Sequence, residues 1–106
     1  MTSKEKNTML IEKTLTGTAA TLKITGRVDT TTAPQLDAAV VDAAAGAKEL
    51  VLDCSALEYI SSAGLRVILK AEKMMRAQGS MKLTHVNEIV MEVLDMTGFA
   101  DLLTIE

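Results

Sequence analysis

Apolar and polar residues alternate along the first part of the chain with the period of β-strands. The ranges 8–14 and 18–25 are predicted strands, and in the second every other residue is apolar, as in a strand with one buried face. Residues 15–17, which include a glycine, predict a turn between them, and residues 26–29 are expected to leave the sheet. The pattern therefore predicts a β-hairpin.

The period then changes to that of an α-helix over residues 33–45. One of the threonines at 30–32 is expected to cap this helix, Pro34 suits its first turn, and Gly46 ends it. Residues 50–52 form a short continuous apolar run, which is typical of a central strand covered on both faces. A helix thus connects the hairpin to a buried strand.

A short loop and two serines separate this strand from a second predicted helix, which runs to about residue 78. A strand over 81–85 and a helix over 86–97 follow, and the apolar residues of 102–105 could add an edge strand. The order β-β-α-β-α-β-α predicts an α/β fold, with a mixed sheet of four to five strands and helices packed on it.

The composition is that of one small domain. The 106 residues suffice for one hydrophobic core, and 48% of them are hydrophobic but only 2% aromatic, so an aliphatic core is expected. Residues 1–7 are polar and predict a flexible N-terminus, which leaves 8–106 as a single domain. No internal repeat or linker divides this domain.

Charge and cysteine content argue against several classes of protein. The net charge is −3 and the basic residues are scattered, so no binding to nucleic acid is expected. No apolar run approaches the roughly 20 residues that insert into a membrane, and no stretch has the pattern of a signal peptide. A single cysteine, Cys54, cannot form an internal disulfide, so a cytoplasmic location is expected.

Two adjacent serines, Ser61 and Ser62, precede the second helix. Either hydroxyl could satisfy the free N–H groups at the helix end, which is the ordinary structural interpretation. The same position favours an anion, because the helix dipole and these N–H groups stabilise negative charge. The small residues Ala63 and Gly64 would leave the backbone open to the active site of a partner. The residues alone favour the ordinary cap over a functional site; if the site is functional, its chemistry is that of a phosphorylation switch and not of a catalyst.

The remaining polar candidates favour structural interpretations. His85 has no Cys or carboxylate at ligand spacing, so no metal site is predicted, and Cys54 is expected to be an inert thiol. Asp29 and Asp53 follow strands and are interpreted as turn-forming acceptors. The sequence has no glycine-rich phosphate loop and no catalytic set, so neither a cofactor nor an enzyme activity is predicted. A solvated helix face is the interpretation favoured over a specific contact for Lys70, Lys73 and Arg76.

Four segments, in this order along the chain, resemble one known family. Residues 57–65 closely resemble the switch segment of the bacterial STAS-domain anti-sigma-factor antagonists, and residues 22–29 resemble that family's second strand and its exit. Residues 50–53 resemble the central strand and 94–99 the closing segment, so the resemblance extends over nearly the whole chain. It implies a compact STAS fold, with a mixed sheet flanked by helices on one side.

The resemblance also implies partner switching. The unphosphorylated antagonist would bind an anti-sigma factor that is a serine kinase of the histidine-kinase-like ATPase type, and so release a sigma factor. Phosphorylation by the kinase would end this complex, and a PP2C-like serine phosphatase would restore it. The alternative is a non-phosphorylated STAS binding subunit of a transport or lipid-trafficking complex. A small nucleotide hydrolase is disfavoured because no set of a general base, a nucleophile and an anion-binding group can be assembled from the sequence.

Aligned on Gly64, the phosphoserine of the family falls on Ser62, with Ser61 as the alternative. The family usually has Asp before this serine and Ser or Thr after it, whereas this chain has Ser61 and Ala63. Asp29 matches an acidic position that the family places near the switch serine. The resemblance therefore implies a partner-binding surface made of Asp29, Ser61, Ser62, Ala63, Gly64 and Arg66.

Overall fold

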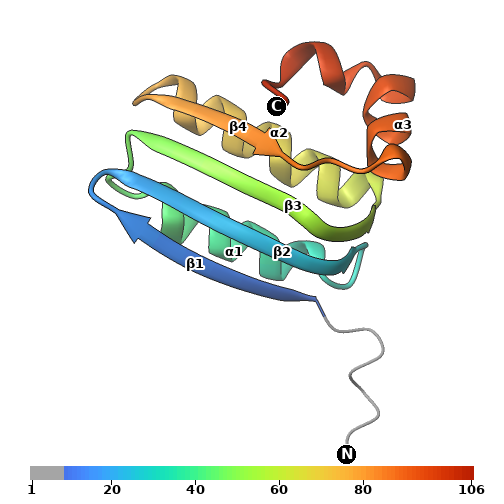
Figure 1. Ribbon diagram of the computed structural model, residues 1–106, viewed down its shortest axis with the longest axis horizontal. Coiled ribbons are helices and arrows are strands. Elements are labelled where there is room, and N and C mark those ends of the chain that lie inside the picture. Colours follow the sequence, from blue (N-terminus) through green and yellow to red (C-terminus); the bar gives the residue numbers. More distant parts are fainter. Residues whose placement is uncertain (1–8) are drawn as a thin grey trace, which may run out of the picture.

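The computed structural model describes residues 9–106. The flexible segment expected at 1–7, and the first residue of the strand expected at 8–14, lie outside this described part. Four strands and three helices follow one another in the order that the sequence predicts (Figure 1). Their bounds are β1 (Leu10–Thr16), β2 (Ala19–Val28), α1 (Ala33–Ala44), β3 (Glu49–Ile60), α2 (Ser62–Arg76), β4 (Ser80–Thr84) and α3 (Glu88–Thr97), with a short 3-10 helix at Phe99–Leu102.

The four strands form one mixed sheet in the order β1-β2-β3-β4. β1 is antiparallel to β2, whereas β2, β3 and β4 run parallel. The crossover helices α1 and α2 lie side by side on one face of this sheet (Figure 1), and α3 packs against β3. The α/β fold expected from the sequence is thus confirmed. Of the optional fifth strand only one parallel bridge forms, between Ile105 and Leu83 of β4.

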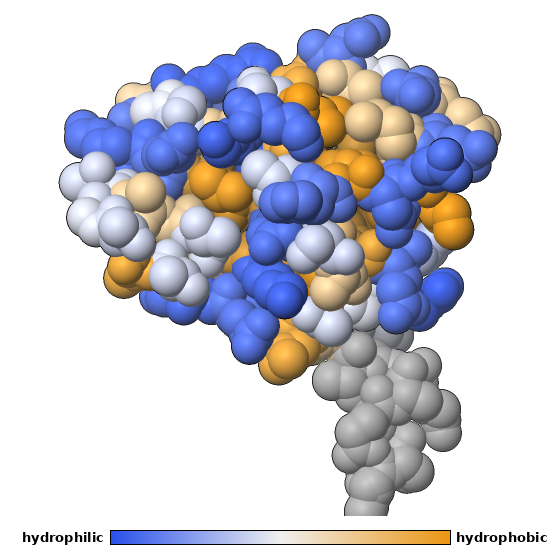
Figure 2. Space-filling model, viewed as in Figure 1, coloured by the Kyte–Doolittle hydropathy of each residue, from blue (hydrophilic) through white to orange (hydrophobic). Residues whose placement is uncertain are grey.

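The hydrophobic core lies between the sheet and the two crossover helices. Alternate residues of β2 and β3 face it, and burial of one such large aliphatic side chain stabilises the fold by about 1.5–3 kcal/mol. The opposite face of the sheet carries mainly hydrophilic and intermediate side chains (Figure 2). The core residues of these elements include Leu22, Ile24, Val28, Leu50, Leu52, Ile60, Leu36, Val40, Leu65, Ile68 and Met75.

β2 and β3 are longer than the sequence predicts. Residues 26–28 were expected to leave the sheet, and residues 53–60 to contain a loop, yet both segments pair with each other up to Val28 and Ile60. The pairing register shifts twice, between Lys23 and Thr25 and between Gly26 and Arg27. Each shift places one extra residue in β3, which breaks the alternation of buried and exposed positions. The broken alternation explains why this part of β3 resembles a loop in the sequence.

Several element ends also differ by a few residues from the expectation. β1 runs on to Thr16, and the turn lies at 17–18. α2 ends at Arg76, and α3 begins only at Glu88. His85 was expected within the fourth strand, but it has a φ of 59°, a left-handed conformation that ends β4 before it.

Candidate functional site

The candidate site lies where β2 and β3 end side by side. Val28 pairs with Ile60, and the backbone N–H of Ser61 donates to the carbonyl oxygen of Val28 at 2.8 Å. The connections that lead to α1 and α2 therefore start next to each other, the first with Asp29 and the second with Ser61. This pairing places the predicted acidic residue beside the predicted serine turn, although 32 positions separate Asp29 from Ser61 in the chain.

The two serines have different roles at the start of α2. Ser61 is the N-cap: its Oγ accepts from the N–H of Gly64 at 3.4 Å, and its carbonyl oxygen accepts from the N–H of Leu65 at 2.9 Å. Ser62 is the first helical residue, and its side chain is exposed. The sequence left open which serine caps the helix, and the structure assigns the cap to Ser61.

Gly64 holds the first turn of α2 close to the strand ends. A Cβ atom built on Gly64 would lie 2.6 Å from Cγ1 of Val28 and 2.7 Å from Cγ1 of Ile60, which is closer than side-chain atoms pack. Gly64 is accordingly buried, so it contributes to the site by letting the helix approach the sheet. Arg66 follows on the outer surface of α2, one turn beyond Ser62. Ala63, between them in the first turn, is half-buried.

Asp29 organises the loop before α1. Its Oδ1 accepts from the hydroxyl and the N–H of Thr31, at 2.7 and 2.9 Å, and from the N–H of Thr32 at 3.1 Å. The hydrogen bond from the Thr31 hydroxyl, followed by that from the Thr32 backbone, lowers the pKa of Asp29. Asp29 is thus a turn-forming acceptor, as interpreted from the sequence, and it also keeps a negative charge in the loop whose start lies next to Ser61.

A threonine was expected to cap α1. Thr32 occupies the N-cap position, but its side chain makes no capping hydrogen bond to the helix. Its hydroxyl instead donates to the carbonyl oxygen of Arg27 at 3.0 Å and accepts from the N–H of Asp29 at 2.8 Å. Thr32 therefore ties the loop to the end of β2, and this fixes the position of Asp29.

Three further residues at this end of the sheet, Arg27, Tyr59 and Asn87, are not predicted from the sequence. The guanidinium of Arg27 lies 4.7 Å from the ring centroid of Tyr59, which is a cation–π contact between residues near the ends of the paired strands β2 and β3. The two residues become neighbours only through the register shifts in β3, so no sequence spacing reveals them. Asn87 caps α3 and donates from Nδ2 to the carbonyl oxygen of Leu57 at 2.8 Å, which joins α3 to β3.

The other polar candidates do not join this site. Cys54 is fully buried, and burial raises the pKa of its thiol to about 12, with a smaller contribution from the charge of Asp53. Asp53 lies 3.6 Å from the exposed imidazole of His85. The backbone hydrogen bond from Ser55 is the main cause that lowers the pKa of Asp53. None of the helices formed by residues 9–106 has the length and apolar character that crossing a membrane requires.

Comparison with known protein families shows to which family the chain belongs. The family model described as Mlab, STAS domain, matches residues 11–104. Because this match covers most of the chain, the chain belongs to the STAS-domain family.

Two relatives are similar in sequence. BtrV of Bordetella bronchiseptica, provisionally named an anti-sigma factor antagonist, is 44% identical over 78 residues, which are 70% of this chain and 66% of BtrV, just under two thirds of its length. The anti-sigma-B factor antagonist of Bacillus subtilis is 32% identical over 85 residues, 79% of this chain and 78% of that protein.

Solved structures share the fold at low sequence identity. An anti-sigma factor antagonist from Mycobacterium paratuberculosis superposes with a TM-score of 0.86 at 19% identity, covering 93% of this chain and 86% of that one. The Bacillus cell fate determinant SpoIIAA in its phosphorylated form superposes with a TM-score of 0.70 at 16% identity, covering 93% and 91%. The STAS fold expected from the sequence is therefore confirmed.

Proposed function

We propose that this protein is an anti-sigma-factor antagonist that is controlled by phosphorylation of Ser62. The unphosphorylated form binds an anti-sigma serine kinase of the histidine-kinase-like ATPase type and releases a sigma factor. Phosphorylation by that kinase ends the complex, and a PP2C-like serine phosphatase restores it. The names of the two sequence relatives support the general function. The cycle needs ATP, so it takes place in the cytoplasm.

The observation that carries the proposal is the separation of roles between the two serines. Ser61 is engaged as the helix cap, whereas Ser62 is exposed at the first position of α2, beside the loop that carries Asp29. A kinase can therefore modify Ser62 without removing the hydrogen bond that begins the helix. SpoIIAA, which shares this fold, exists in a phosphorylated form, and this supports a covalent switch on the same scaffold.

The physical effect of a phosphate on Ser62 differs between the fold and the interface. The phosphate adds about −1.5 to −2 charges at pH 7. At the N-terminus of α2 the helix dipole favours that charge by roughly 0.3–1 kcal/mol, so the fold is retained. In a docked interface the same charge loses its hydration and faces the carboxylate of Asp29. Like-charge contacts of this kind cost several kcal/mol, so the complex dissociates.

A second candidate function is a STAS binding subunit of a transport or lipid-trafficking complex that is not phosphorylated. The residues beside Ser62 favour it, because Ser61 and Ala63 replace the Asp and the Ser or Thr that usually flank the switch serine. Both functions describe a binding protein and not an enzyme. They differ in whether a charge at Ser62 changes the choice of partner.

The test combines capture and phosphorylation. Wild type, Ser62→Ala and Ser62→Asp serve as baits in a lysate of the native cells, and the captured proteins are identified by mass spectrometry. The proposal expects a kinase-like anti-sigma factor on the first two baits and not on the third. With ATP, the purified kinase should phosphorylate wild type at Ser62, and Ser61→Ala at the same residue. Recovery of one membrane complex on all three baits would instead establish the second candidate.

A further inference from the structure

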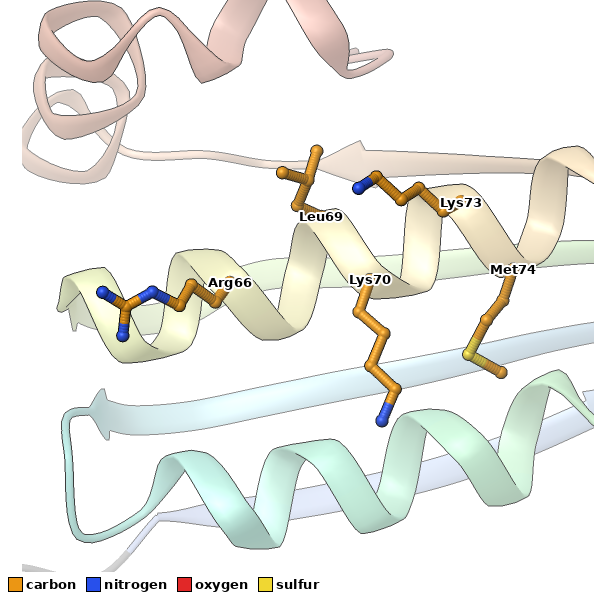
Figure 3. A pocket seen from close by; sticks show the side chains of 5 residues that line it. All are labelled: Arg66, Leu69, Lys70, Lys73 and Met74. Atoms are coloured by element: carbon orange, nitrogen blue, oxygen red, sulfur yellow. The ribbon is translucent and has the colours of Figure 1, made fainter.

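A stripe of basic residues runs along the outer surface of α2 and begins one turn after Ser62. We call Arg66, Lys70 and Lys73 the basic stripe; all three side chains are exposed. Their spacing of i, i+4 and i+7 places them on one face of the helix. From this face the three side chains spread apart: Figure 3 shows that Arg66 extends toward the amino-terminal end of α2, that Lys70 points toward α1, and that Lys73 points away from α1.

Two apolar side chains lie among these cations. Leu69 and Met74 are half-buried, and with the basic stripe they line a shallow depression of about 400 Å³ on α2. Leu69 points to the same side as Lys73, and Met74 points toward α1 beside Lys70 (Figure 3). The depression thus combines apolar contact area with positive charge at its rim, which is a common arrangement in protein–protein interfaces.

The charge of α2 is opposite to that of the protein as a whole. α2 holds four of the 11 Lys and Arg residues of the chain but only one of its 14 Asp and Glu residues, although the net charge is −3. That single acid, Glu72, pairs with Arg76 at 3.0 Å, and Lys70 pairs with Asp37 of α1 at 2.9 Å. Within residues 9–106, Arg66 and Lys73 form no ion pair. Their charges are therefore available to a partner.

We propose that the basic stripe binds an acidic surface of the anti-sigma kinase, whose side chains pair with Arg66 and Lys73 while an apolar residue contacts Leu69. This inference rests on the proposed function and extends the docking surface from Ser62 along α2. A protein fits better than a lipid surface, because none of the large hydrophobic side chains that are strongly exposed within residues 9–106 belongs to α2. A nucleic acid fits poorly because the protein is acidic overall.

The position of Arg66 connects the stripe to the switch. Residues four apart on a helix are neighbours on its surface, so a phosphate on Ser62 would lie within reach of the guanidinium of Arg66. The phosphate would then compete with the acidic side chains of the kinase for this cation. Phosphorylation thus adds a repulsive charge and also withdraws an attractive one from the same interface.

The test measures association kinetics between this protein and the purified kinase at about 50 mM and 500 mM salt. The variant Arg66→Glu/Lys73→Glu reverses two charges on the stripe. The control Lys23→Glu/Lys48→Glu makes the same charge change at exposed residues on the sheet and at the opposite end of β3. Charge reversal should lower the association rate constant at low salt roughly tenfold or more relative to the control, and high salt should reduce this difference. The stripe variant should unfold at about the wild-type midpoint in urea. The control should remain folded without denaturant but unfold at a lower midpoint, because Lys23→Glu places a third carboxylate between Glu12 and Asp53 on the neighbouring strands.

The two proposals fail in distinguishable ways. Wild type that does not bind the kinase overturns the proposed function. If wild type binds the kinase but the stripe variant associates with it as fast as the control does, only this inference is overturned. Vesicles containing phosphatidylglycerol and a DNA duplex serve as further probes at low salt. The inference would be contradicted if wild type, but not the stripe variant, sediments with either probe while both associate with the kinase at the same rate. The stripe would then be assigned to binding that probe.

Discussion

The different roles of the two serines make a direct prediction about stability. Ser61→Ala removes the Oγ that accepts from the N–H of Gly64, whereas the backbone bonds of residue 61 to Val28 and Leu65 remain. Loss of an N-cap side chain costs about 0.5–2 kcal/mol. The observed cap bond is long, at 3.4 Å, so a value near 1 kcal/mol or below is expected. Ser62→Ala removes no cap, and alanine has the higher helix propensity, so its stability should stay within about 0.5 kcal/mol of wild type.

Urea unfolding of the two variants measures this difference. With a denaturant slope of about 1–3 kcal/mol per M, loss of 1 kcal/mol lowers the midpoint by roughly 0.3–1 M. The pair is well matched, because both changes are serine to alanine at adjacent positions and affect the unfolded chain alike. If Ser62→Ala lost as much stability as Ser61→Ala, or more, the assignment of the cap to Ser61 would be wrong. Ser62 would then no longer be the serine that is free for modification.

Three further predictions concern other parts of the chain. Gly79→Ala should destabilise the protein by about 1–3 kcal/mol in urea unfolding, because a Cβ there would clash with the carbonyl oxygen of Lys48; wild-type stability would contradict this packing. Cys54 should not react with iodoacetamide at pH 8 until urea unfolds the chain, because the thiol is buried and its pKa is raised to about 12; rapid labelling of the native protein would refute this. Since the pKa of Asp53 is lowered from 3.8 in the folded state, the ionised carboxylate stabilises the fold above that pH. The stability gap between wild type and Asp53→Asn should therefore be present at pH 7 and shrink as the pH falls below 3.8; a gap independent of pH would show that the charge is not responsible.

The sequence predicts the order of elements because the periods of its apolar residues are clear. α1 and α2 bury the stripes of Leu36 and Val40, and of Ile68 and Met75, that helical spacing predicts. The second half of β3 could not be predicted, because two register shifts break its alternation. These shifts depend on pairing with β2 and leave no local pattern.

The candidate site could be predicted only in part. The sequence places two serines at the start of a helix, but the backbone conformation decides that Ser61 caps and Ser62 projects outward. The close approach of Gly64 to Val28 and Ile60 is a tertiary contact, so a glycine in a helix gives no hint of it. The available charges on α2 likewise depend on which acids lie near each cation in the fold. Spacing within α2 alone could not separate a solvated face from a binding stripe.

The central claim is that a negative charge at Ser62 breaks the complex with the kinase and leaves the fold intact. The most direct test is a calorimetric titration of the purified kinase with this protein, unmodified and phosphorylated at Ser62, together with urea unfolding of both forms. The account predicts at least about 100-fold weaker binding after phosphorylation, with an unfolding midpoint equal to or above that of the unmodified form. Equal affinity of the two forms, or weaker binding that accompanies a loss of folding stability, would contradict it.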